Sequence, residues 1–344
     1  MVLGLGKTHI PYGMFDVERS ADEARRFAKC ERIYHRGQEI AWDGKEILPM
    51  LIEKHGGIDV EDDKKEALKR IFSIILWGEL AAWRIAAQLA DRLEPLEAKM
   101  AATSQAHDEA RHFYVMYDYL CKLGYVPERL DRAPQAILDI VVGTDNLAYK
   151  LVGMQLLVEP MALTVFQTVR EIAVEPVLTE LMRYFERDEA RHVGLGMQYL
   201  PVLMKDWNRR QISAMVTFQV RLMFWALWEQ KILENDLVVL GIDPRKSLDR
   251  ARKKQLAVLQ TAFEAIGLPL DRERNYATMT MNAVIEFLFP ADGVKAGLRG
   301  KLESVWNAFW RRPDRIDVTE LDVHFSHAIK TARGEIARAE RISA

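Results

Sequence analysis

Two identical pentapeptides carry the residues of this chain that are best suited to chemistry. They are Asp108-Glu109-Ala110-Arg111-His112 and Asp188-Glu189-Ala190-Arg191-His192. In a helix, Glu and His at positions i and i+3 project from one face, so each motif can offer a carboxylate and an imidazole to the same ion. A single Glu-x-x-His is usually an exposed helix face. The related stretch Asp22-Glu23-Ala24-Arg25-Arg26 lacks the His, and we interpret it as surface.

Two further glutamates lie in unusually apolar surroundings. Glu79 falls within the apolar stretch Ile71–Ala90 and Glu159 within Leu151–Val169, and each precedes the Glu of the next motif by 30 residues. The repeated spacing indicates internal duplication. Burying an unpaired carboxylate costs several kcal/mol, so each glutamate needs a partner. Both stretches are apolar enough to suggest a membrane span, but the central charges and the charged flanks predict no membrane insertion.

The duplicated pattern predicts a centre for two metal ions. Four carboxylates balance the charge of two divalent ions, and oxygen ligands with one imidazole per ion favour iron over zinc or calcium. Manganese or a mixed iron and manganese pair is the alternative. If no metal binds, the same pattern predicts a duplicated bundle that is held together by buried ion pairs. The six predicted ligands are Glu79, Glu109, His112, Glu159, Glu189 and His192.

The elements that must position these residues are long helices. Apolar residues recur at steps of three and four, and no segment alternates with the period of a strand, so we expect an all-α fold. Proline and glycine at the breaks are typical of helix starts and stops. We expect four core helices within 61–206, an arm at 1–60 packed on them and a helical extension at 207–344 of the same domain. The core helices are predicted at 64–93, 95–123, 135–171 and 176–204.

Shorter helical patterns flank the core. In the arm we expect one helix near Ala21–Ile40, followed by a turn at Trp42-Asp43-Gly44. In the C-terminal extension, helices are predicted at 208–240, 246–266, 272–289 and 318–341.

Composition excludes several classes of protein. Lys and Arg total 48 against 50 Asp and Glu, without a basic tract that would attract nucleic acid. Cys30 and Cys121 are far apart in sequence, which indicates reduced thiols and a cytoplasmic protein rather than a disulfide scaffold. Residues 1–15 lack the charged start and apolar run of a secretory signal, so we expect none.

Over residues 64–204 the motifs resemble the ferritin-like superfamily. The similarity is to its larger dioxygen-activating members, namely the hydroxylase subunits of bacterial multicomponent monooxygenases, the acyl carrier protein desaturases and the small subunits of ribonucleotide reductase. The resemblance implies a ferritin-like four-helix bundle with a di-iron centre that reacts with dioxygen. It does not distinguish among these subfamilies.

The resemblance also implies a set of residues behind the ligands. In such proteins the aspartate of one motif holds the ligand histidine of the other, which here pairs Asp188 with His112 and Asp108 with His192. The arginines that would balance this buried charge are Arg111 and Arg191.

Two positions depart from the subfamilies. Ribonucleotide reductase small subunits place a radical-bearing tyrosine four residues after the first ligand histidine, where this chain has Met116, and Tyr117 is out of phase unless the helix is irregular. The multicomponent hydroxylases carry a threonine four residues after the third glutamate, where this chain has Leu163. Thr164 is one step away, and Pro160 is expected to kink or bulge this helix beside the metals.

Together these observations predict an oxidoreductase, for example a monooxygenase, that uses two iron ions and dioxygen. Hydroxylation, desaturation and nitrogen oxidation of a small or fatty organic substrate all remain open. The alternative is a non-enzymatic ferritin-like subunit that handles iron or a redox cofactor. No flavin, nicotinamide or iron–sulfur motif occurs, so we expect a separate reductase or ferredoxin, and a homodimer is compatible with the sequence.

The sequence leaves two details of the site open. Glu186, three residues before the ligand Glu189, is a candidate seventh carboxylate at the edge of the centre. Apolar residues on the ligand faces predict a dry chamber beside the metals. The residues on these faces are Phe72, Ile75, Ala82, Trp83, Gln155, Leu156, Ala162, Leu163 and Phe166.

Overall fold

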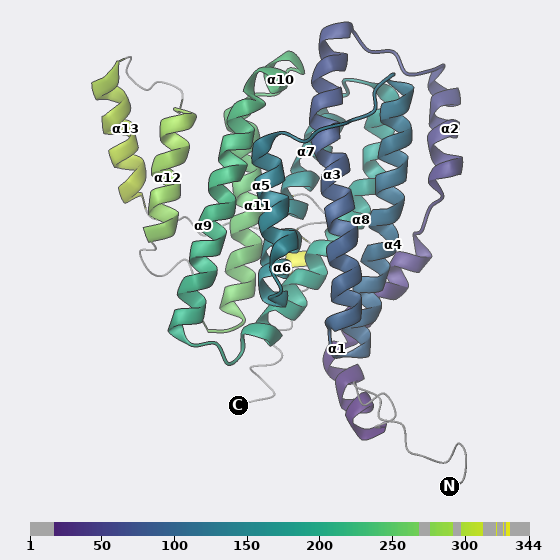
Figure 1. The fold of residues 1–344 in the computed structure, drawn as a ribbon, viewed down its shortest axis with the longest axis vertical. Helices are drawn as coiled ribbons and strands as arrows, with labels where there is room; N and C mark the ends of the chain where they lie inside the picture. Colours follow the sequence, from purple (N-terminus) through teal and green to yellow (C-terminus); the bar gives the residue numbers. More distant parts are fainter. Residues whose placement is uncertain are drawn as a thin grey trace.

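The all-α prediction is confirmed. The computed structural model describes residues 17–267, 276–291, 297–311, 321, 326 and 328–330. Within these residues the regular elements are helices and no strand is present. Most of the helices run along the long axis of the molecule, side by side (Figure 1).

Four helices carry the six predicted ligands. They are α3 (Asp62–Arg92), α4 (Leu96–Lys122), α7 (Glu159–Ile172) and α8 (Pro176–Met204). α3 packs along α4, α7 packs along α8, and α4 contacts α8 (Figure 1). The short connections between α3 and α4 and between α7 and α8 make each pair antiparallel.

The start of α8 illustrates how sequence determines one of these boundaries. Glu175 is the N-cap, and its buried carboxylate accepts hydrogen bonds from the backbone N–H groups of Val177 and Leu178 at 2.9 and 2.6 Å. Pro176 occupies the first helical position, where the missing N–H costs nothing. The predicted boundaries of the first, second and fourth core helices are confirmed within two residues.

The prediction of a single helix over 135–171 is wrong. The segment consists of α5 (Arg132–Gly143), α6 (Leu147–Gly153), a π-helical turn η1 (Met154–Val158) and α7. Asn146 ends the continuity because its side chain caps α6, accepting from the N–H groups of Ala148 and Tyr149. The buried Lys150 ammonium donates to the carbonyl of Val142 at 2.9 Å, so the end of α5 also has a partner.

The irregularity expected at Pro160 is confirmed. In η1 the N–H of Glu159 bonds to the carbonyl of Met154, five residues earlier. Proline supplies no N–H for the next helical bond, so a widened turn at this point is less costly than in a regular helix. The extra residue changes the rotational phase of the helix just before the ligand position.

Two N-terminal helices pack against the core. α1 (Val17–Glu39) lies along α4 and also contacts α8, in agreement with the predicted helix near Ala21–Ile40. The sequence did not predict α2 (Gly44–His55), which contains Pro49 and packs on α8 and α4. The predicted turn at Trp42-Asp43-Gly44 joins these helices, and Asp43 caps α2 by accepting from the N–H of Lys45.

The C-terminal helices form a layer beside the core. α9 packs against α5, and α11 packs against α7 and α8. The helix predicted at 208–240 is interrupted at Leu233, where α9 gives way to α10. The sequence did not predict α13. The helix predicted at 318–341 lies mostly outside the described residues. The elements are α9 (Arg209–Ile232), α10 (Glu234–Val239), α11 (Pro244–Glu264), α12 (Tyr276–Leu288) and α13 (Leu298–Trp310).

The buried polar residues separate two apolar clusters. On α3 the side chains before Glu79, such as Phe72, belong to one cluster, and those after it, such as Ile85, belong to the other. α8 changes cluster in the same way on either side of Glu189. The polar layer therefore crosses the bundle between two hydrophobic layers.

One apolar segment among the described residues is long enough to cross a membrane. It is Leu147–Ile172, and 78% of its most apolar window is buried inside the fold. The stretch Ile71–Ala90 does not meet the same criteria. Burial of the segment against other helices is what the core helix of a globular protein shows.

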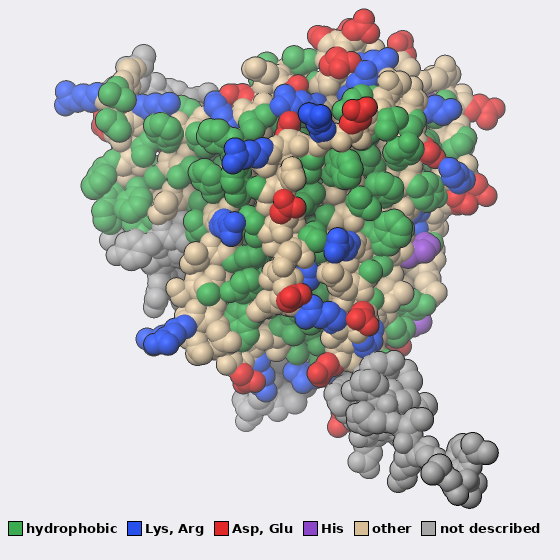
Figure 2. Space-filling model, in the orientation of Figure 1, with side chains coloured by type: hydrophobic (Ala, Val, Ile, Leu, Met, Phe, Trp, Pro, Cys, Tyr) green, Lys and Arg blue, Asp and Glu red, His purple; other side chains and the backbone are tan. Residues whose placement is uncertain are grey.

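Large hydrophobic side chains are exposed on the outer helices. Figure 2 shows hydrophobic side chains over the edge of the molecule formed by α12 and α13. The exposed aromatic residues on α9, α12 and α13 are Phe224, Trp228, Phe287, Trp306 and Trp310.

Candidate metal centre

The structure brings all six predicted ligands together. They form two overlapping groups that share Glu109 and Glu189, and in each group one ligand atom per residue lies within 4.8 Å of the others. Glu79 and His112 complete the first group, and Glu159 and His192 complete the second. All six side chains are buried. This arrangement can hold a metal pair, and the assignment of each residue as a ligand stays a prediction.

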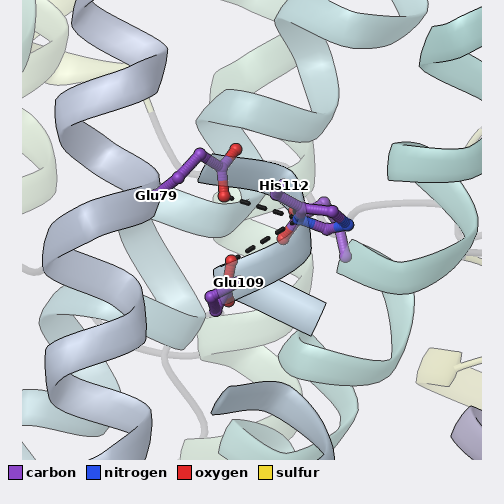
Figure 3. A group of neighbouring side chains, drawn as sticks. Glu79, Glu109 and His112 are labelled. Atoms are coloured by element: carbon purple, nitrogen blue, oxygen red, sulfur yellow. Dashed lines mark ion pairs between the residues drawn. The ribbon is translucent and has the colours of Figure 1, made fainter. Parts of the chain in front are cut away.

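The first group surrounds one nitrogen of His112. Its Nδ1 lies 3.4 Å from Oε2 of Glu79, 3.5 Å from Oε2 of Glu109 and 3.1 Å from Oε1 of Glu189. Figure 3 shows Glu79 reaching from α3 toward the Glu109 and His112 side chains of α4.

The second group surrounds the corresponding nitrogen of His192. Its Nδ1 lies 3.0 Å from Oε1 of Glu109, 3.1 Å from Oε2 of Glu189 and 4.0 Å from Oε1 of Glu159. The two shared glutamates therefore direct one oxygen toward each histidine. Carboxylates in this position are suited to bridge two ions.

The other nitrogen of each imidazole is held by an aspartate of the opposite motif. His112 Nε2 lies 3.2 Å from Oδ2 of Asp188, and His192 Nε2 lies 3.3 Å from Oδ2 of Asp108. Hydrogen bonds and the charges of the neighbouring cations keep the pKa of both aspartates low despite their burial, so each aspartate is ionised and can only accept. Nε2 therefore donates, and Nδ1 is left to present a lone pair to a metal.

Two arginines neutralise these aspartates. Arg111 donates to Oδ1 of Asp108 at 2.6 Å and to Oδ2 of Asp188 at 2.8 Å. Arg191 donates to Oδ2 of Asp108 at 2.6 Å and to Oδ1 of Asp188 at 2.9 Å. The four buried side chains form a closed ring of ion pairs that connects α4 to α8. This ring fixes both histidines in one orientation.

Unpartnered polar atoms show that the residues fit a metal. Nδ1 of His112 lies 3.5 Å from Oε2 of Glu109 and 3.1 Å from Oε1 of Glu189, yet the geometry gives none of these three buried atoms a hydrogen bond. Unpartnered buried polar atoms are costly and uncommon in native proteins. Each of these atoms belongs to the two predicted groups, where an ion would satisfy it.

The pKa shifts of the four glutamates indicate how the centre stays neutral without metal. Burial raises the pKa of Glu79 and Glu159 well above the ordinary value, and the charges of Glu109 and Glu189 raise it further. Burial also acts to raise the pKa of Glu109, but the nearby imidazolium groups outweigh it and lower that pKa. The pKa of Glu189 is lowered as well, against the effects of burial and of Glu109, with His192 among the groups that lower it.

The histidines complete this balance. Burial alone would lower the pKa of His112 and His192, but their carboxylate neighbours raise both well above the ordinary value. Two neutral carboxyl groups, two carboxylates and two imidazolium ions then sum to zero charge. Two divalent ions with four carboxylates and two neutral imidazoles also sum to zero.

A glutamine pair that the sequence did not assign to the centre contacts the second group. Gln105 donates through Nε2 to Oε1 of Glu109 at 3.0 Å and to Oε1 of Glu159 at 2.9 Å. Gln155 donates to Oε1 of Gln105 at 3.1 Å. Gln105 precedes Glu109 by four residues, so its position on the ligand face was a usable signal.

The two halves of the duplication differ at these positions. The counterpart of Gln105 in the second half is Phe185, whose ring stacks on His112 with 4.3 Å between centroids. The counterpart of Gln155 is Ile75, an apolar residue. One group therefore has polar neighbours and the other apolar neighbours, so the two ion positions are chemically different.

Trp42 is a second residue that the sequence did not assign to the site. Its indole N–H donates to Oδ2 of Asp188 at 2.8 Å, the same atom that accepts from His112. Arg111 lies over the Trp42 ring, 4.8 Å from its centroid. The linker between α1 and α2 thus closes one side of the centre.

The candidate seventh carboxylate does not join the centre. Glu186 accepts a hydrogen bond from Nε of Arg170 at 2.8 Å and belongs to neither group. Thr164 is buried, but its hydroxyl donates to the carbonyl of Pro160 at 2.7 Å, so the bulge does not free it for the metals. Met116 is packed in an apolar cluster, and Tyr117 is 39% exposed on the surface.

A cavity of about 130 Å³ lies beside the centre, between α3, α5, α7 and α9. Glu79 and Glu159 form part of its wall, and most of the remaining wall is apolar. Of the predicted chamber residues, Ile75, Ala82 and Ala162 line it. The other predicted residues do not line the cavity. Gln155 contacts Gln105, and Trp83 is exposed. The remaining four pack in the apolar clusters, and they are Phe72, Leu156, Leu163 and Phe166.

The cavity wall contains one further carboxyl group, that of Glu229 on α9. It is 6% exposed, and neither of its oxygens has a hydrogen-bond partner. Its pKa is raised to about 7, chiefly by burial and also by the charge of Asp131, while Arg70 acts to lower it. No motif in the sequence around Glu229 indicated this position.

Comparisons with known proteins supply no family for the chain. No protein-family model matches it, and no curated protein sequence is significantly similar to it. The interpretation of the centre therefore rests on its own geometry.

Metal uptake should release protons. Because the metal-free centre holds protons on Glu79, Glu159 and both imidazoles, two divalent ions should displace about four of them. Isothermal titration of ferrous or manganous ions, in buffers of different ionisation enthalpy, measures this number. Apparent affinity should rise with pH, by roughly tenfold per pH unit for each proton released. Uptake without proton release would contradict the assigned charge states.

Glu229 should destabilise the fold at high pH. Its pKa is about 7 in the folded protein and near 4.5 otherwise, so the folded state holds the extra proton between these values. The free energy of unfolding should therefore fall as pH rises through this window, by about 3 kcal/mol in total. Glu229→Gln removes this loss, so thermal unfolding should show the variant stabilised relative to the parent at pH 8 but not at pH 4.5. An equal difference at both pH values would contradict the pKa assignment.

Proposed function

We propose that this chain is a ferritin-like di-iron oxidoreductase that uses dioxygen to oxidise a small or fatty organic substrate. The observation that carries the proposal is the pair of buried groups sharing Glu109 and Glu189, next to an apolar cavity walled by Glu79 and Glu159. Four helices supply these residues, as the resemblance to the ferritin-like superfamily implies.

The donor set supports iron. Four carboxylates and one imidazole per ion are hard and borderline ligands, and no thiol lies in either group. Iron ions bound there would supply the electrons that activate dioxygen. Manganese or a mixed pair fits the same ligands.

The protein itself orients the ligands and excludes water. The ion-pair ring of Asp108, Asp188, Arg111 and Arg191 keeps Nδ1 of each histidine directed at the carboxylates. The Phe185 ring covers His112 and limits access of water on that side. A pre-oriented and dry site favours oxidation of a bound substrate over loss of oxidising equivalents to solvent.

The cavity supports an enzyme rather than an iron-handling subunit. The described lining residues are mainly isoleucine, leucine, valine and alanine, with one carboxyl group, that of Glu229, besides those of Glu79 and Glu159. Such a lining suits an organic molecule. Repeated turnover then requires electrons from a separate reductase or ferredoxin.

Anaerobic titration of the metal-free protein with ferrous ions tests the proposal. Two ions should bind per chain, and subsequent exposure should consume about one dioxygen per ion pair. Glu189→Gln should lose at least one of the two ions, because both groups use this residue. Atomic absorption and an oxygen electrode provide the two readouts.

Glu186→Gln is the matched control. It changes a buried glutamate on the same helix, three residues away, whose partner is Arg170 rather than the centre. This variant should retain both ions. Accumulation of ferric iron well beyond two ions per chain would argue for iron storage, and absence of bound metal from the parent protein would refute the proposal.

A further inference from the structure

When it is ionised, Glu229 makes one part of the cavity wall anionic. Nearby, Arg70 pairs with Oδ2 of Asp131 at 2.9 Å and with Oδ2 of Asp236 at 3.1 Å. One guanidinium therefore faces three carboxyl groups when Glu229 is ionised. Since the Arg70 side chain is already shared by two aspartates, the excess negative charge remains with Glu229.

Glu229 has no hydrogen-bond partner that would explain its burial. Both oxygens lack a hydrogen bond although the side chain is 94% buried, being 6% exposed, and it lines the cavity. An uncompensated buried carboxyl group lowers stability, so a side chain of this kind is better explained by a ligand than by packing.

The wall of the cavity follows α3 for about three turns. Along α3 its lining residues extend from Ile71 to Ala82, which corresponds to about 16 Å of helix. Its volume is only about 130 Å³. Figure 1 shows α5 between α9 and α3, and contacts of α5 with both helices close this side of the cavity. An unbranched chain fits these dimensions better than a bulky ring system.

We propose that the cavity binds an unbranched primary amine, with its ammonium group at Glu229 and its chain directed toward Glu79 and Glu159. This assignment rests on the proposed function and specifies its substrate class. The ammonium ion offers three donors to the two unpartnered oxygens and neutralises the excess charge. A fatty acid would place a second anion beside Glu229, and an alcohol would leave the charge unbalanced.

Binding to the metal-free protein tests the proposal independently of any reaction. Isothermal titration at pH 8, where Glu229 is ionised, would compare hexylamine, 1-hexanol and hexanoate. The amine should bind at least about tenfold more tightly than the alcohol, and hexanoate should bind most weakly. Glu229→Gln should weaken amine binding by about tenfold or more and change alcohol binding by less than about threefold.

Two variants serve as controls. Glu303→Gln changes an exposed glutamate on α13 and should leave amine affinity unchanged. Gly78→Val adds side-chain atoms to the cavity wall, where a Cβ would have no neighbour within 4 Å, and should weaken binding of the amine and the alcohol alike.

Several results would overturn the amine assignment. These are failure of the amine to bind, alcohol or hexanoate affinity equal to that of the amine, or unchanged amine affinity in Glu229→Gln. Ferrous binding and dioxygen consumption are measured separately, so Glu229-dependent amine binding without dioxygen consumption would refute only the proposed function. Dioxygen consumption without amine binding would refute only the substrate class.

Discussion

Four glutamates and two histidines are buried in the middle of a helical bundle, and the need to neutralise their charge governs the structure around them. Protons can do this in the metal-free protein and divalent ions can do it in the loaded protein, because both states sum to zero charge. The free energy of metal binding and the pH of the solution are therefore coupled. The apolar layers on either side keep water out, which increases the cost of any imbalance.

The ion-pair ring formed by both motifs extends this balance beyond the ligands. Asp108 and Asp188 each hold the histidine of the other motif, and each contacts both arginines. The pentapeptides thus act as one unit. The two halves differ next to this unit, where glutamines adjoin one ion position and Phe185 adjoins the other. Both halves contribute the same residues to the ring but different residues beside it, and this difference makes two similar ion positions unequal.

The sequence predicted the centre better than it predicted the cavity. The i, i+3 spacing places Glu109 and His112 on one face of α4, and the short antiparallel connection from α3 brings Glu79 to the same level of the bundle. The break before Asn146 and the helix α2 were missed because capping and tertiary packing outweighed local propensity there. Glu229 was missed for a different reason. Its importance arises from contacts between α9, α3 and α5, which no local pattern encodes.

The proposed function depends on two ions held side by side by the shared residues Glu109 and Glu189. X-ray diffraction from iron-loaded crystals, with anomalous data at the iron absorption edge, tests it directly. Two anomalous peaks about 3.5 to 4 Å apart are expected between these glutamates, each with Nδ1 of one histidine beside it. A single peak, or iron bound outside the two groups, would contradict this arrangement.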